Sequence, residues 1–175
     1  MSETDTKDEN LLGHFQEAML RASGPAIHRA LDEKLDDAQA IDAEYACLMS
    51  MMLEPKNPTM WNALALVQMI SSKPDDAEDS IRRSLEIDTS NSWTWTIWGD
   101  LLKNENRIIE SERAYRMAVE LDPVNEHALR QLVFITDSRE AHPETLTLLE
   151  TLLPQLPEDQ ELWDIYSRCL RRMKK

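Results

Sequence analysis

The side chains able to carry out chemistry are few in this chain, and their spacing does not assemble a site. No two of the four histidines share a helix face at metal-ligand spacing; they are His14, His28, His127 and His142. His28 and Asp32 lie one helical turn apart, but without a nucleophile motif beside them we expect a surface pair. Cys47 and Cys169 form neither a metal-ligand spacing nor a redox pair, which predicts two buried thiols.

Phosphate and calcium loops are also missing from the sequence. The only glycines are Gly13, Gly24 and Gly99, so no glycine-rich phosphate loop exists. The acidic run 75–79 lacks the ligand spacing of a calcium loop and fits a solvated helix start. We therefore predict no catalytic residue, no cofactor, no metal site and no enzymatic activity.

The composition narrows the class of partner. A formal charge of −14 repels phosphate backbones, so nucleic acid and anionic membranes are poor partners and basic or apolar proteins are better ones. The alternative interpretation is that the negative charge serves solubility alone. No apolar run reaches the ~18 residues that a membrane-spanning helix needs. Residues 1–10 are polar and acidic, unlike a secretory signal, so the expected location is the cytoplasm.

The elements that position these side chains follow a register of 34 residues. A polar residue suited to cap a helix recurs at this spacing, as Asn57, Asn91, Asn125 and Asp159. Four residues after each comes a large apolar one: Trp61, Trp95, Leu129 and Trp163. A fixed period of this length indicates a solenoid, in which each repeat buries its apolar face against its neighbours.

Two apolar-periodic segments within each repeat predict two helices. The fold class expected is an all-α solenoid of helix pairs. We predict a disordered acidic tail at 1–8, an N-terminal helix at 9–23 and a repeat domain at 24–175. Its parts are four repeats and a capping helix: 24–57, 58–91, 92–125, 126–159 and 160–175.

The pattern resembles the tetratricopeptide repeat, whose 34-residue unit has large residues at position 4 and small ones at positions 8, 20 and 27. Position 20 reads Ala43, Ala77, Ser111 and Thr145 here. The sequence departs from the family pattern at Leu31 and Val133 in position 8, Thr89 in position 32 and Leu152 in position 27. These departures affect the expected local packing and leave the repeat itself intact.

The resemblance implies antiparallel helix pairs in a right-handed superhelical solenoid, with a concave groove lined by the first helix of each repeat. The residues it places there as partner-binding are Asn62, Leu66, Met69, Ile70, Trp93, Thr96, Lys103, His127, Arg130, Phe134 and Arg168. Apolar anchors in this set would hold a peptide or helix, and Arg130 and Arg168 would hold acidic groups on it. Two alternatives remain open: helix 9–22 covers the groove, or Trp93 packs against its neighbours.

The expected function is a non-enzymatic adaptor that binds a protein or peptide. The alternative is a cytoplasmic secretion-type chaperone for an apolar client, because small acidic proteins of that kind are similar in length and begin with a leading helix. The chain lacks the cations of the family's clamp for chaperone tails, since Asn62 and His127 stand at two of its positions. Pairing of two chains through repeat 24–57 is a further open possibility.

Overall fold

The computed structural model describes residues 43–48, 51 and 54–173. The predicted tail at 1–8, the helix at 9–23 and most of the repeat 24–57 lie outside these residues. The chain divides into two compact parts, Met1–Ile97 and Trp98–Lys175, called here the N-terminal and C-terminal parts. Each part is described by itself.

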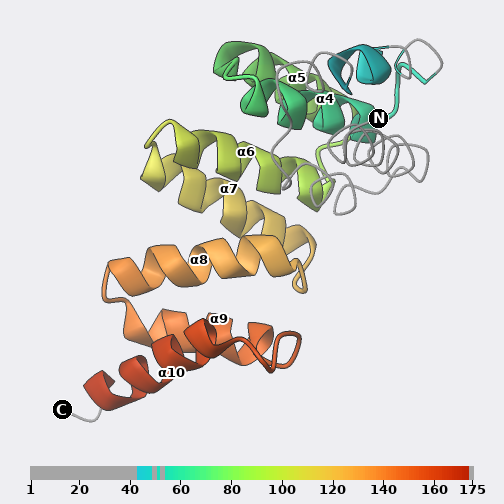
Figure 1. Ribbon diagram of the computed structural model, residues 1–175. Helices are drawn as coiled ribbons and strands as arrows, with labels where there is room; N and C mark the ends of the chain where they lie inside the picture. Colours follow the sequence, from blue (N-terminus) through green and yellow to red (C-terminus); the bar gives the residue numbers. More distant parts are fainter. Residues whose placement is uncertain (1–42, 49–50, 52–53, 174–175) are drawn as a thin grey trace, which may run out of the picture. The chain divides into compact units, whose positions relative to one another are not determined.

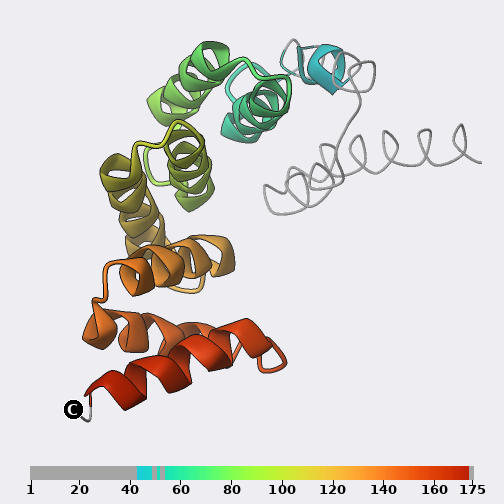
Figure 2. The same ribbon diagram turned by 60° about the vertical axis from the view of Figure 1, so that its left-hand side comes forward.

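The described part of the chain contains helices and no strands (Figures 1 and 2). Residues 43–48 are helical, and seven longer helices follow in chain order: α4 (Pro58–Ile70), α5 (Pro74–Ile87), α6 (Ser92–Asn104), α7 (Ile108–Leu121), α8 (Glu126–Ser138), α9 (His142–Leu152) and α10 (Gln160–Met173). In the C-terminal part, α8, α9 and α10 lie side by side in this order in both views. No helix among the described residues is long and apolar enough to cross a membrane.

A side-chain cap starts the first helix of each repeat, as the register predicted. The side-chain oxygens of Asn57 and Asn91 accept backbone N–H bonds from the residues two positions on, each at 3.0 Å. Asn125 and Asp159 accept from the residues three positions on, at 3.0 and 3.2 Å. Each cap satisfies a backbone donor that the helix start would otherwise leave without a partner.

The turn between the two helices of a repeat is also built the same way each time. Ser72, Asn106 and Glu140, again 34 residues apart, have φ of 57°, 62° and 57°. The N–H of the following residue bonds to the carbonyl five positions back in all three turns, at 2.8 to 3.0 Å. This left-handed ending closes the helix tightly and reverses the chain, so the second helix runs antiparallel to the first.

Buried hydroxyl groups join the helices of the N-terminal part. The Ser84 hydroxyl on α5 donates to the Pro58 carbonyl at 3.1 Å and lies 3.0 Å from the Thr94 hydroxyl on α6. Asn62 on α4 donates to the same threonine at 3.0 Å. The Ser84 and Thr94 hydroxyls and the Asn62 amide nitrogen are buried and hydrogen-bonded, so they fix the relative positions of three helices.

Close approach of α6 and α7 organises the start of the C-terminal part. The Ser111 hydroxyl, at position 20 of its repeat, donates to the Gly99 carbonyl at 2.8 Å. The Tyr115 ring packs directly on Gly99: a β-carbon there would lie 2.5 Å from the ring. Position 8 of this repeat must therefore lack a side chain, because Tyr115 is fully buried.

The departures from the family pattern in the last repeat are absorbed by one apolar core. Val133 and Leu152 are both fully buried in a cluster formed by α8, α9 and α10. There the Thr145 hydroxyl, at position 20, bonds the Thr136 hydroxyl at 3.0 Å and the Ala141 carbonyl at 3.0 Å. Larger residues at positions 8 and 27 are thus accommodated by local repacking.

The tryptophans at position 4 do more than fill space. The indole N–H of Trp95 donates to the Thr89 carbonyl, and that of Trp163 donates to the Pro157 carbonyl, both at 2.9 Å. Each acceptor is the residue at position 32 of the preceding repeat. Because the acceptor is a backbone carbonyl, Thr89 serves as well as proline. Trp163 remains 40% exposed, so its position reflects this bond as much as burial.

Replacing Ser72 by glycine should stabilise the protein. A non-glycine residue in the left-handed region destabilises the fold by about 1–2 kcal/mol, so glycine removes this strain. Glycine also has more conformational entropy in the unfolded state, which offsets roughly 0.5–1 kcal/mol of the gain. We expect the free energy of unfolding in urea to rise by about 0.5–1 kcal/mol. Ser71, with φ of −75°, is the matched control, and Ser71→Gly should be neutral or destabilising. Equal effects of the two variants would contradict this account of the turn.

Gly99→Ala should destabilise the protein although alanine favours helices. The propensity gain is about 1 kcal/mol, whereas forcing a methyl group into a packed core costs typically about 1–3 kcal/mol. The contact of 2.5 Å with a buried ring favours the upper end of that cost. Chemical denaturation should show a net loss, with the exposed Asn104→Ala on the same helix changing stability by less than about 0.5 kcal/mol. A more stable Gly99→Ala variant would refute the predicted clash.

Candidate partner-binding surface

Polar bridges tie together the first helices of successive repeats in the C-terminal part. His127 Nε2 lies 2.8 Å from Asp100 Oδ1, and Lys103 Nζ donates to Gln131 Oε1 at 2.7 Å, which joins α6 to α8. Two further bridges join α8 to α10 and its cap: Arg130 to Asp159 at 2.6 Å and Arg168 to Asp137 at 2.5 Å. We call the surface that carries these bridges the α6–α8–α10 face.

Helical spacing places one apolar residue in the middle of this face. On α8, His127, Arg130, Phe134 and Asp137 follow one another at three or four residues, so they share one side of the helix. Phe134 is partly buried and packs against the apolar core of the C-terminal part. It is the apolar member of a stripe whose other members form polar bridges, and part of its ring stays accessible.

Asp100 is held in place from two sides. The Tyr115 hydroxyl donates to Asp100 Oδ1 at 2.6 Å, and His127 approaches the same oxygen. Burial, together with the negative charge of Asp100, raises the pKa of Tyr115 far above its ordinary value. The phenol therefore stays protonated and keeps donating, which positions the bridge between α6 and α8.

The structure places the residues expected to bind a partner in three kinds of environment. Asn62, Leu66 and Thr96 are buried in the N-terminal part, where Asn62 bonds Thr94 and Thr96 bonds the Ser92 carbonyl at 3.0 Å. Leu66, expected to be an apolar anchor of the groove, is buried by packing. The accessible members of that part are Met69, Ile70 and Trp93, partly or largely exposed.

The predicted residues of the C-terminal part are all at least partly accessible. Lys103 is exposed, and His127, Arg130, Phe134 and Arg168 are half-buried. Arg130 and Arg168, expected to hold acidic groups on a partner, are each paired with an aspartate of the chain itself. A partner carboxylate would have to share or displace those aspartates. Their role in partner binding stays a prediction.

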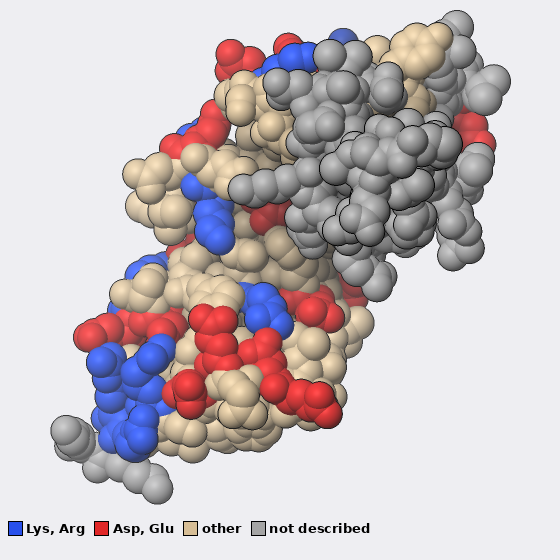
Figure 3. All heavy atoms as spheres, in the orientation of Figure 1, with Lys and Arg blue, Asp and Glu red and all other residues tan. Residues whose placement is uncertain are grey.

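Charge is distributed unevenly along α10. Its first turn carries Glu161 and its last turn carries Arg171 and Arg172. Figure 3 shows acidic atoms gathered over the start of this helix and basic atoms near its C-terminal end. This order complements the helix dipole and gives this region a bipolar surface.

Two groups of residues were missed by sequence reasoning. The bridging pairs are separated by 27 to 31 residues, a little less than one repeat, so complementary side chains at that spacing could have revealed them. The second group is Asp137, His142 and Cys169, which are far apart in the sequence and which the structure brings together. Their positions at a helix end, a helix start and mid-helix gave no local motif.

Comparison with known proteins identifies the fold. No family model matches the chain. A stretch of 148 residues, 84% of the chain, is 31% identical to the general transcriptional corepressor ssn6 of Schizosaccharomyces pombe, but it spans only 13% of that protein. Among solved structures, TTC0263, a thermophilic tetratricopeptide-repeat protein of Thermus thermophilus, is similar with a TM-score of 0.62, at 14% identity over 93% of this chain and 98% of that one.

A third similarity is to the structure of Naa15/Naa10 bound to HypK-THB, with a TM-score of 0.64 and 16% identity over 94% of this chain and 22% of that one. These likenesses define the class of fold. The chain has the tetratricopeptide-repeat fold, which confirms the predicted all-helical solenoid of helix pairs.

Asp159→Asn should lower the free energy of unfolding only slightly at neutral pH. It should also remove part of the pH dependence of that free energy. Asparagine keeps the helix cap but loses the ion pair with Arg130, a partly exposed pair contributing up to about 1 kcal/mol. Hydrogen bonds from Arg130 and from the backbone of Leu162 lower the pKa of Asp159 below its ordinary value.

The sign of the effect follows from that lowered pKa. The bridge stabilises the folded state fully above the ordinary carboxyl pKa, about 3.9, and the contribution disappears as pH falls through the folded-state value. Urea unfolding at pH 7 and at pH 3 or below should therefore show the two proteins converging in acid. A difference that stays constant or grows in acid would contradict the bridge.

Proposed function

We propose that the chain is a non-enzymatic protein-interaction module that binds a peptide or helix of a partner on the α6–α8–α10 face. The observation that supports this most strongly is Phe134, a partly accessible aromatic side chain between polar bridges on the same helix side. Aromatic side chains surrounded by satisfied polar groups are typical of the residues that dominate binding energy at interfaces.

The bridges favour binding because they fix the surface in advance. Lys103, His127, Arg130 and Arg168 are already held by partners on neighbouring helices, so less side-chain entropy is lost when a partner docks. The paired charges also form a polar rim around an apolar centre, which is the arrangement that protein interfaces favour.

The charges point to the chemistry of the partner. The arginines of the face are largely neutralised by Asp159 and Asp137, and the whole chain carries a charge of −14. The partner segment proposed is therefore one with an apolar anchor for Phe134 and basic residues that meet the acidic start of α10. Acidic groups that reach Arg130 or Arg168 would add a second, weaker contact.

The breadth of partners separates the adaptor from the secretion-type chaperone. Affinity capture from the native host with untagged competitor, read by mass spectrometry, should recover soluble proteins that share a short segment. Recovery of one membrane-active client, kept soluble only by this chain, would favour the chaperone instead.

Phe134→Ala should weaken binding of a partner identified in that way. Loss of an interface anchor costs typically about 2 kcal/mol or more, so we expect the dissociation constant to rise about 30-fold, measured by calorimetry with the purified partner segment. Ile109→Ala is the matched control. Ile109 is a 71% exposed apolar residue on α7, the second helix of its repeat, which is not part of the α6–α8–α10 face. Far-ultraviolet circular dichroism at the assay temperature checks that both variants are folded. Unchanged affinity in a folded Phe134→Ala protein would rule out the proposed face.

A further inference from the structure

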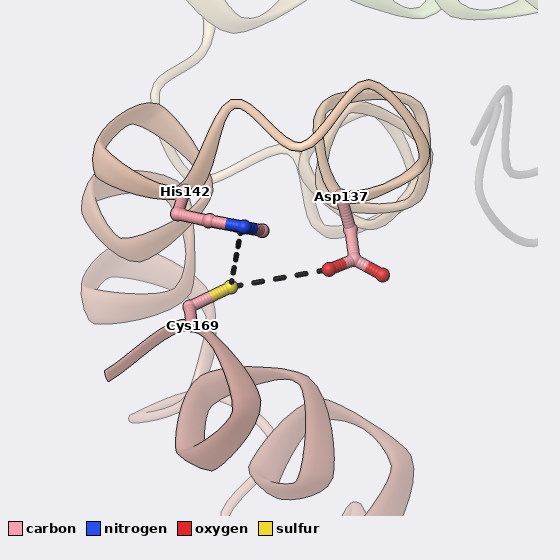
Figure 4. A group of neighbouring side chains, drawn as sticks. All are labelled: Asp137, His142 and Cys169. Atoms are coloured by element: carbon pink, nitrogen blue, oxygen red, sulfur yellow. Dashed lines mark hydrogen bonds between the residues drawn. The ribbon is translucent and has the colours of Figure 1, made fainter. Parts of the chain in front are cut away.

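Three side chains with different donor atoms meet inside the C-terminal part (Figure 4). Asp137 lies at the end of α8, His142 at the start of α9 and Cys169 on α10. The Cys169 sulfur is 3.7 Å from His142 Nδ1 and 3.9 Å from Asp137 Oδ1. One donor atom from each of the three lies within 4.8 Å of the others.

The fold itself creates this meeting point. The left-handed turn at Glu140 reverses the chain within a few residues, which brings His142 back beside Asp137. Cys169 belongs to the apolar core that α8, α9 and α10 share, and it is fully buried there. In Figure 4 dashed lines join the sulfur to an imidazole nitrogen of His142 and to a carboxylate oxygen of Asp137.

The donor set has the composition of a zinc site. Thiolate, imidazole and carboxylate are the ligands of Zn²⁺, whereas Mg²⁺ and Ca²⁺ take oxygen ligands almost alone. Zinc bonds of about 2.0–2.3 Å in a tetrahedron place neighbouring donor atoms roughly 3.3–3.6 Å apart. The two separations from the sulfur, 3.7 and 3.9 Å, exceed this by a few tenths of an ångström. The three donor atoms lie within 4.8 Å of one another, so side-chain rotation has to draw them closer around the ion.

Two arginines surround the group. Arg172 Nη1 lies 3.4 Å from His142 Nε2, and Asp137 Oδ2 accepts from Arg168 while Oδ1 faces the thiol. A metal bound through His142 Nδ1 leaves the ring proton on Nε2, so binding requires a shift of Arg172 towards Glu140, which it already contacts at 3.1 Å.

The charges of the cluster accommodate a divalent cation. A thiolate and a carboxylate together carry two negative charges, and Arg168 offsets part of the carboxylate charge through Oδ2, which leaves Oδ1 and the sulfur to face the ion. The Arg168 bond to the second Asp137 oxygen orients the carboxylate as an outer-shell partner does.

We propose that Asp137, His142 and Cys169 form a binding site for one zinc-like divalent cation, with water in the fourth coordination position. Spacing along the sequence predicted no metal site, whereas the fold brings together residues that are far apart in the sequence. The site shares Asp137 with the α6–α8–α10 face but does not involve Phe134. Metal binding and the effect of Phe134→Ala on partner binding therefore test the two proposals separately.

Cobalt provides a direct test because a thiolate ligand gives Co²⁺ a charge-transfer absorption band. The untagged full chain, stripped with a chelator and kept reduced, is titrated with Co²⁺ and the bound ion is then displaced with Zn²⁺. We expect one equivalent to bind with the thiolate band, and Zn²⁺ to remove it and raise the melting temperature. Absence of the band at saturating Co²⁺ would overturn the proposal.

Matched variants assign the ligands. Cys169→Ser should abolish the thiolate band, while Cys47→Ser, which removes the other buried cysteine, should leave it unchanged. His142→Ala and Asp137→Asn should each weaken Zn²⁺ binding about 10-fold or more. Circular dichroism verifies that each variant is folded. If Cys169→Ser does not fold, His142→Ala and Asp137→Asn still test the ligand assignment. A band lost in Cys47→Ser and kept in Cys169→Ser would overturn the assignment.

Discussion

The structure depends on satisfying the backbone groups at the ends of its helices. Each short helix leaves donors at its start and acceptors at its end without partners. The 34-residue register satisfies these groups in the same way at each repeat. An asparagine or aspartate caps the start of the first helix, as at Asn57 and Asn91, and a left-handed turn residue lies between the two helices. Because these ends are fixed in the same way, the helices of each repeat pair in the same antiparallel manner.

Much of the fold could be predicted because its determinants are local. Caps, turn positions and the large residue at position 4 all lie within a few residues of the groups they contact. The indole bonds of Trp95 and Trp163 to carbonyls six residues back show why this position is so regular. That the fold accommodates Val133 and Leu152 at positions where the family has small residues was less predictable, because it depends on how three helices pack around them.

The candidate surface was predictable in outline and not in detail. The register correctly indicated that His127, Arg130 and Phe134 share one side of a helix, because that is a matter of period. It could not show that Leu66 is buried or that Arg130 and Arg168 already have carboxylate partners, since those contacts join different repeats. Complementary side chains 27 to 31 residues apart identify the bridging pairs, but that spacing can be recognised only once the helix packing is known.

Asp137 connects the two features that sequence reasoning missed. Its Oδ2 accepts from Arg168 in the bridge between α8 and α10, and its Oδ1 faces the sulfur of Cys169. A carboxylate with both oxygens engaged is restricted in rotation, so the bridge holds the second oxygen where the cluster needs it. The same short turn that reverses the chain at Glu140 sets the position of His142. The repeat geometry that fixes helix pairing therefore also aligns the three donor atoms, although none of the three residues belongs to the repeat's own sequence pattern.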